Sequence, residues 1–201
     1  MTFPRPATDS EESIMSTAPA PVALGPLGDP EILATIGDEA IDTRDSGGFE
    51  LDPEAQCLNA LLWSPATTVT RIAEHLDETD FYRPDFAELY TVIARLARAG
   101  QAHTAALVAA QLQRTAGMRS DYLRRALLDV AIGDARAHDA NHYALAVLSQ
   151  SYRRGYIIAA TRLSHIAETA GEDELFEQMC VLGRACHAAR DRLHAATTAL
   201  T

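Results

Sequence analysis

Lysine is absent from this chain of 201 residues, in which all 17 basic side chains of the Lys/Arg type are arginine. Chemistry that needs a lysine amine, such as a Schiff base or the phosphate-binding lysine of a P-loop, is therefore excluded. Aromatic residues make up only 6% of the chain, and no proline follows Pro84. Both features, together with abundant alanine, favour helices over strands. We therefore predict an all-α fold.

Cysteine is also scarce. Cys57, Cys180 and Cys186 are odd in number and widely spread, unlike a disulfide framework, and the spacing of the last two does not fit a zinc knuckle. The N-terminus lacks the apolar core of a signal peptide, and no apolar run approaches the ~20 residues that span a bilayer. We expect a cytoplasmic protein that has no membrane segment.

A basic excess is lacking as well, because the formal net charge is −11. Residues 1–50 alone hold ten acids, two arginines and six prolines. This composition predicts a disordered acidic tail, in which residues 31–36 could form a short helical turn. Proteins that bind nucleic acid directly normally carry a basic face, so we expect no direct contact with nucleic acid.

Residues 51–135 contain start and stop signals for about five short helices. Asp52-Pro53 and Ser64-Pro65 each place a capping residue before a proline, which suits a helix start. Thr104 and Ser120 can cap two later helices in the same way. Short connections between these helices predict a compact unit, which we name the headpiece.

The central helix of the headpiece begins at Pro84 and ends at Gly100. Proline suits the first turn of a helix, and glycine tolerates the left-handed conformation that follows the last turn. The apolar residues between them share one stripe of the helix, which indicates a buried face: Phe86, Leu89, Tyr90, Ile93, Leu96 and Ala97.

Residues 136–201 change in character. From Asp139 to Ala170 only Gly155 interrupts a helical pattern, and Gly171 then makes a turn. A second helix follows with apolar residues in a heptad pattern: Leu175, Met179, Leu182, Cys186, Ala189, Leu193 and Ala196. Two long helices joined by a tight turn predict an antiparallel hairpin that folds as one unit with the headpiece.

A hairpin buries one seam between its two helices, so its other apolar residues need a further surface, either the headpiece or a second copy of the chain. We favour self-association. The predicted interface comprises Tyr143, Val147, Ile157, Ile158, Leu175, Phe176, Met179, Val181 and Leu182.

The order of these motifs is similar to that of a known family. Asp80-Phe81-Tyr82-Arg83-Pro84 lies between the helix at residues 53–62 and the Leu89-Tyr90 and Gly100 positions of the central helix. With the hairpin included, residues 52–195 resemble the N-terminal domain of DnaB-type replicative helicases. The resemblance implies assembly into dimers or a hexameric ring, and binding to the C-terminal domain of primase or to a replicative helicase.

The chain also departs from that family. DnaB-type helicases continue into an ATPase domain, whereas this chain ends at Thr201 and, having no lysine, contains no P-loop. Residues 117–120 read Gly-Met-Arg-Ser, without the paired glycines expected of the family. We therefore expect an interaction module rather than an enzyme. The alternative is a structural or regulatory helical module of the same fold with no role in replication.

Aromatic and arginine side chains dominate binding hot spots, so Phe81, Tyr82, Arg83, Arg153 and Arg154 are candidates for partner binding. The competing interpretations are core packing for the aromatic residues, Trp63 included, and a solvated helix surface for the arginines.

His138 and His142 have a spacing that can hold zinc, but no third ligand is evident. Helix capping and solvent exposure explain these histidines better. Cys186 lies on the heptad seam, where a small buried hydrophobic residue is expected. We therefore predict no metal, cofactor or catalytic site.

Overall fold

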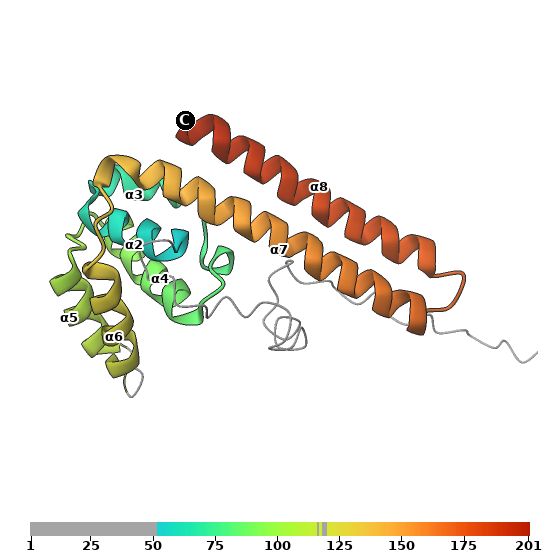
Figure 1. Cartoon of the computed structure of the whole chain (residues 1–201), viewed down its shortest axis with the longest axis horizontal. Coiled ribbons are helices and arrows are strands. Elements are labelled where there is room, and N and C mark those ends of the chain that lie inside the picture. The colour runs from blue at the N-terminus through green and yellow to red at the C-terminus, as the bar shows by residue number, and fades with distance from the viewer. Residues whose placement is uncertain (1–51, 116, 118–119) are drawn as a thin grey trace, which may run out of the picture.

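The computed structural model describes residues 52–115, 117 and 120–201, and these residues form helices with no strand among them (Figure 1). The predicted all-α fold is confirmed. The tail predicted for residues 1–50, with its helical turn at 31–36, lies outside the described residues. The helices are α2 (Pro53–Trp63), α3 (Ala66–Ile72), η2 (Glu78–Asp80), α4 (Pro84–Arg98), α5 (Ala105–Thr115), α6 (Ser120–Ala131), η4 (Ala137–Asp139), α7 (Ala140–Thr169) and α8 (Leu175–Leu200).

Helix α2 lies at the centre of the headpiece. Its predicted start is confirmed, because a side-chain oxygen of Asp52 accepts a hydrogen bond of 2.9 Å from the backbone N–H of Glu54, and Pro53 is the first helical residue. Every residue from Glu54 to Leu62 is buried. A helix that is buried on all sides needs neighbours on all sides, and α2 packs against α4, α6 and α7.

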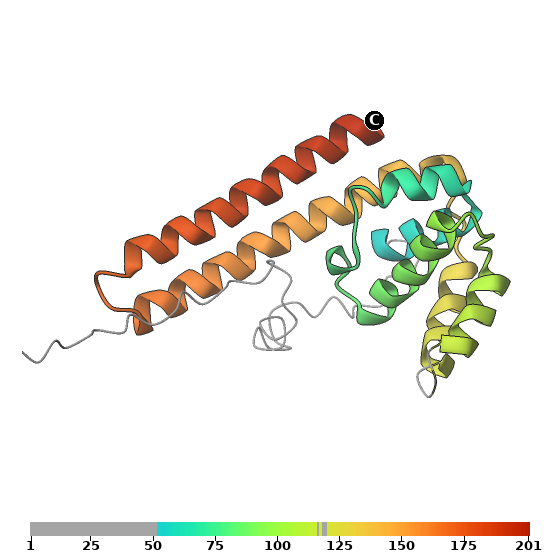
Figure 2. The ribbon, with the colours of Figure 1, turned by 180° about the vertical axis from the view of Figure 1, so that it is seen from behind.

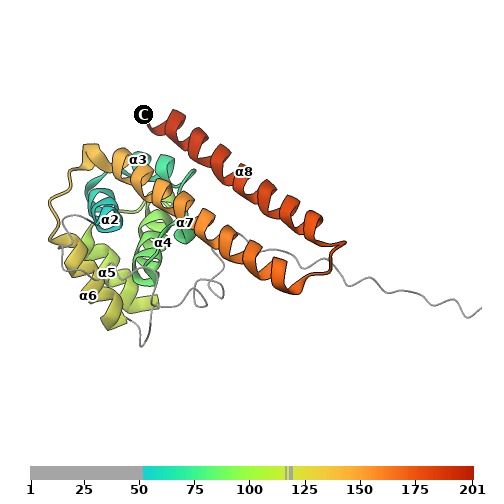
Figure 3. The same cartoon turned by 45° about the vertical axis from the view of Figure 1, so that its right-hand side comes forward.

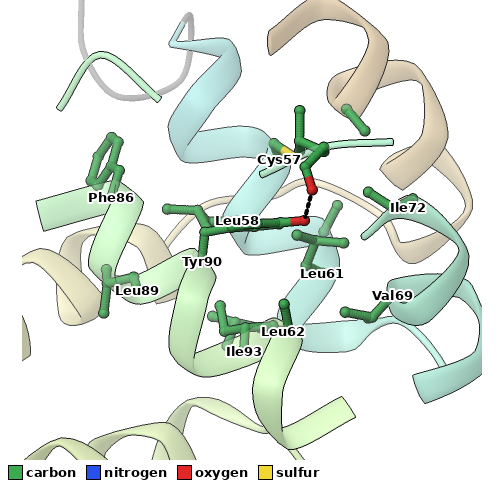
Figure 4. Close-up of a cluster of buried hydrophobic side chains, with 14 of the residues drawn as sticks. Cys57, Leu58, Leu61, Leu62, Val69, Ile72, Phe86, Leu89, Tyr90 and Ile93 are labelled. Carbon is green, nitrogen blue, oxygen red and sulfur yellow. Dashed lines mark hydrogen bonds between the residues drawn. The ribbon is translucent and has the colours of Figure 1, made fainter. Parts of the chain in front are cut away.

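Helix α4 packs against α2 and contributes many of the buried side chains of the headpiece core (Figure 4). It begins at Pro84 and is followed by Gly100 at a φ of +65°, as the sequence predicts. The hydroxyl of buried Tyr90 donates a hydrogen bond of 2.6 Å to the carbonyl of Leu76. This bond satisfies a polar group inside the core and fixes the turn that follows α3 against α4.

Helices α7 and α8 lie side by side and run in opposite directions (Figures 1 and 2). The base of this hairpin joins the headpiece core through four residues of α7 and two of α8: Ala140, Ala144, Val147, Leu148, Ala196 and Leu200. Beyond its base the hairpin extends away from the headpiece (Figure 3). The core therefore crosses residue 135, and the division of the chain at residues 50 and 135 stays a prediction.

Candidate functional site

Glu54 of α2 holds the loop that precedes α4. Its Oε1 accepts a hydrogen bond of 2.7 Å from the backbone N–H of Tyr82, and its Oε2 accepts one of 3.3 Å from that of Arg83. The Nη1 of Arg154 on α7 lies 3.5 Å from Oε1. Burial raises the pKa of Glu54, although these hydrogen bonds and Arg154 act in the opposite direction. One carboxyl group thus joins α2, the loop and α7.

The two aromatic residues of this loop have opposite environments. Phe81 is buried, with its ring centroid 4.9 Å from that of Tyr90. Of the two interpretations, core packing rather than partner binding therefore fits Phe81. Tyr82 is 48% exposed, and the guanidinium of Arg154 lies 5.8 Å from its ring centroid. Trp63, for which core packing was favoured, is instead 62% exposed, because it is the last residue of α2.

The side chain of Arg83 is oriented by its neighbours on α4. It forms a two-pronged ion pair with Asp85, at 3.1 Å from Nε to Oδ1 and 2.6 Å from Nη2 to Oδ2. Its guanidinium carbon also lies 3.9 Å from the ring centroid of Phe86. This planar group is half-buried and geometrically defined, which suits it to recognition.

Asp80 is also buried, and its side chain binds helix α8. Its Oδ1 accepts hydrogen bonds from Nη1 of Arg192 at 2.9 Å and from Oγ of Ser151 at 2.8 Å, while Nη2 of Arg192 donates to Oδ2. Oδ2 also accepts from the backbone N–H of Asp77 at 2.9 Å. The Nε of Arg192 donates to the carbonyl of His75 at 3.1 Å. Arg192 therefore fastens α8 to the η2 region of the headpiece.

Sequence reasoning missed this cluster of Glu54, Asp80, Arg154 and Arg192. Arg154 was predicted as a candidate partner-binding residue, but it donates to the carbonyl of Asp80 and faces Glu54 within its own chain. Arg153, its neighbour, is exposed. Asp80 and Arg192 are 112 residues apart, so no local pattern could have paired them.

The structure divides the predicted hairpin interface into three groups. Ile157, Phe176 and Met179 are exposed, and Tyr143, Leu175 and Val181 are half-buried. Val147, Ile158 and Leu182 are buried by the chain itself. These last three offer no surface to a second copy. Val147 belongs to the headpiece core, so the headpiece covers this residue and a second copy of the chain does not.

The exposed end of the hairpin carries a shallow apolar groove, whose lining comes from both helices. It is lined by Leu163, Ile166, Ala167, Leu175, Phe176 and Met179. Phe176 is 71% exposed and Met179 46% exposed. These apolar side chains lie together at one place, so the groove is a candidate contact surface.

The side chains considered for metal or thiol chemistry do not gather. His138 is exposed and lies 3.5 Å from its neighbour Asp139. Within the described ranges, no group of three or more His, Cys, Asp or Glu residues could hold a metal ion. Cys186 is half-buried on α8, and burial raises the pKa of the Cys57 thiol, which makes this thiol unreactive.

In the part of the chain that the structure describes, no helix is both long enough and apolar enough to cross a bilayer.

Comparisons with known proteins agree with this geometry. A family model described as the DnaB-like helicase N terminal domain matches residues 49–149, from the start of α2 into α7. The crystal structure of the N-terminal domain of DnaB helicase from Mycobacterium tuberculosis is similar, with a TM-score of 0.55 and 25% sequence identity. That similarity covers 68% of this chain and 94% of the other. No curated protein sequence matches.

The family match covers half of the chain, and it includes the loop around Tyr82 and the first part of α7 at the base of the hairpin. The structural match has the same all-α architecture. This chain therefore belongs to the DnaB-like helicase N-terminal domain family.

Proposed function

We propose that this chain is a cytoplasmic, non-catalytic interaction module of DNA replication. In this proposal it self-associates through its hairpin into a dimer or a hexameric ring, and it binds the C-terminal domain of primase or a replicative helicase. The N-terminal domain of DnaB is the non-catalytic part of the helicase, which supports an interaction role. The observation that carries the proposal is the exposed apolar end of the hairpin on a fold of this family.

The hairpin has the dimensions that a self-association surface requires. Its helices contain 30 and 26 residues, so each is about 40 Å long at a rise of ~1.5 Å per residue. Stable interfaces bury about 1,000 Å² or more. Burial of a side chain such as Phe176 stabilises by roughly 1.5–3 kcal/mol. The apolar groove and exposed Ile157 would supply the apolar centre of that interface.

The partner would bind on the headpiece, at the loop before α4, away from the turn end of the hairpin. Tyr82 is exposed there, and Arg83 presents a defined guanidinium beside it. Aromatic and arginine residues of this kind form hot spots. Arg153 on α7 is the remaining exposed arginine of the predicted partner site.

The proposal is tested by light scattering coupled to size-exclusion chromatography at tens of micromolar protein. We expect a dimer or hexamer that Phe176→Glu together with Met179→Glu converts to a monomer. Leu107→Glu on α5 is the matched control, because Leu107 and Met179 have the same exposure of 46%. A monomeric wild-type protein would contradict self-association.

The same experiment is repeated with the primase C-terminal domain and then with a replicative helicase. We expect one of these partners to elute together with the protein, and Tyr82→Ala to weaken that association. If neither partner binds, the replication role is wrong, while the proposal of self-association stands or falls on its own data.

A further inference from the structure

Charge is segregated along the hairpin. Residues 150–165 of α7 and 178–195 of α8 contain six arginines and one acid, Asp191. We name this section the arginine band. The turn end, residues 166–177, contains five acids and no arginine. The positive charge of the hairpin is therefore concentrated in its middle, in a chain whose net charge is −11.

Three of the six arginines in the band form ion pairs with acids of the described residues. Arg154 and Arg192 are directed at Glu54 and Asp80, and Arg190 pairs with Asp191 at 2.8 Å.

The other arginines are Arg153, Arg162 and Arg184, and none of them forms an ion pair with a described residue. The Nε of Arg162 is buried and has no hydrogen-bond partner in the described part of the chain. Arg153 and Arg184, by contrast, are exposed, so their guanidinium groups, which have no ion-pair partner among the described residues, suit an anionic occupant.

The most acidic segment of the chain leads directly to this band. Residues 1–50 contain ten acids and two arginines. They join the fold at Asp52, two residues before Glu54, which contacts Arg154 of the band. Residues 150–165 of α7 span about 24 Å at ~1.5 Å rise per residue, so about seven extended residues of the segment, at ~3.3–3.6 Å each, can follow that length. Attachment also gives the segment an effective concentration of roughly millimolar.

We propose that the acidic segment, residues 1–50, binds in cis along the arginine band and competes there with a second copy of the chain. This proposal rests on the proposed self-association, because exposed Ile157 lies within the band and within the predicted interface. Charge complementarity and the attachment point favour this occupant over nucleic acid, which the net charge of the whole chain repels.

Photo-crosslinking of the full chain tests this contact. A benzophenone amino acid replaces Ile157, and Leu107 on α5 is the control position, because these residues are 47% and 46% exposed. Trypsin leaves residues 1–44 as one peptide, because Arg5 precedes a proline and the chain has no lysine. A mixture of chains labelled with ¹⁴N and ¹⁵N separates links within a chain from links between chains.

We expect position 157 to crosslink to residues 1–44 of the same chain, and position 107 not to do so. Arg153→Glu, one helical turn before Ile157, should lower the yield by about twofold to fivefold, the effect of one exposed ion pair. Arg114→Glu on α5 should not lower it. Equal yields from both positions, links only between different chains, or no link at all would overturn the proposal.

Light scattering then separates this proposal from the proposed function. Replacing Glu39, Asp42, Asp45 and Glu50 by Asn or Gln should weaken the cis contact and increase the dimeric fraction severalfold. An unchanged or smaller dimeric fraction overturns the competition. If every variant is monomeric, self-association is wrong, and the crosslinks alone decide whether the segment binds the band.

Discussion

Two buried acids decide how the long hairpin meets the headpiece. Acidic residues are almost never fully buried unless they are paired. Glu54 is 4% exposed and Asp80 0% exposed. Arginines from the hairpin, Arg154 and Arg192, pair with them. Since an uncompensated charge inside a protein is strongly unfavourable, each pair defines one position of the hairpin on the headpiece.

Asp80→Asn tests this at the scale of a single residue. The amide keeps the shape of the side chain but removes the negative charge that Arg192 faces. Removing one partner of a buried pair destabilises by about 3–5 kcal/mol. Because the side chain of Arg192 is 36% exposed and water can solvate it, we expect the lower end, about 3 kcal/mol, in the free energy of unfolding by urea.

Asp77→Asn is the matched control. Asp77 lies 3.3 Å from the same arginine but is 52% exposed, so its loss should change the free energy of unfolding by less than about 1 kcal/mol. Asparagine also remains a good cap for η2. Equal effects of the two substitutions would show that burial of Asp80 does not matter.

At the scale of an element, two glycines differ in what surrounds them. Gly133 follows α6, and a Cβ there would lie 3.1 Å from Cγ of Asn59 and 3.1 Å from the carbonyl oxygen of Val130. The Nδ2 of Asn59 donates a hydrogen bond of 2.7 Å to that same carbonyl. Gly183 lies within α8, and a Cβ there would have nothing within 4 Å. The first glycine permits α6 to pack on α2, whereas the second only weakens α8.

Alanine substitutions should therefore have opposite signs. Gly133→Ala crowds a hydrogen-bonded contact between two helices, and we expect it to destabilise by about 1–3 kcal/mol. Gly183→Ala improves helix propensity without a clash, and we expect it to stabilise by about 0.5–1 kcal/mol. Thermal or urea unfolding of both variants measures these changes. Destabilisation by Gly183→Ala would indicate that another copy or segment packs closely on α8.

At the scale of the whole molecule, the hairpin has two different ends. Its base shares the headpiece core through residues such as Val147 and Leu200. The amide of Asn141 also donates a hydrogen bond of 2.9 Å to the carbonyl of Leu200. Among described residues between 149 and 195, none belongs to that core cluster. The turn end is therefore stabilised mainly by contacts between α7 and α8.

Hydrogen exchange should report this difference. Backbone amides at residues 160–182 should exchange about tenfold faster, or more, than those at residues 144–151, because regions with fewer buried contacts open at lower free energy. Under conditions where the protein self-associates, protection of residues 160–182 should rise with protein concentration. Mass spectrometry of exchanged peptides measures both. Uniform protection along α7 would show that the hairpin opens only with the headpiece.

Local signals predicted the helices well. The starts at Pro53, Pro84 and Ala105 and the left-handed Gly100 all depend on residues within one or two turns. The helical spacing of Val69, Ile72 and Leu76 indicates one helix through all three. Instead α3 ends at Ile72, and a turn places Leu76 beside Tyr90. The candidate site was predicted less well, since Phe81 and Arg154 engage their own chain rather than a free surface.

The sequence by itself determined the all-α class, the order of the helices and the family resemblance, because caps, prolines and apolar periodicity act over a few residues. Packing in three dimensions sets which apolar residues stay exposed and which charges pair. Val147 and Phe176 are both apolar hairpin residues, yet one is 0% and the other 71% exposed. Burial, and the pairing of Asp80 with Arg192 across 112 residues, depend on packing between distant segments, which no local pattern encodes.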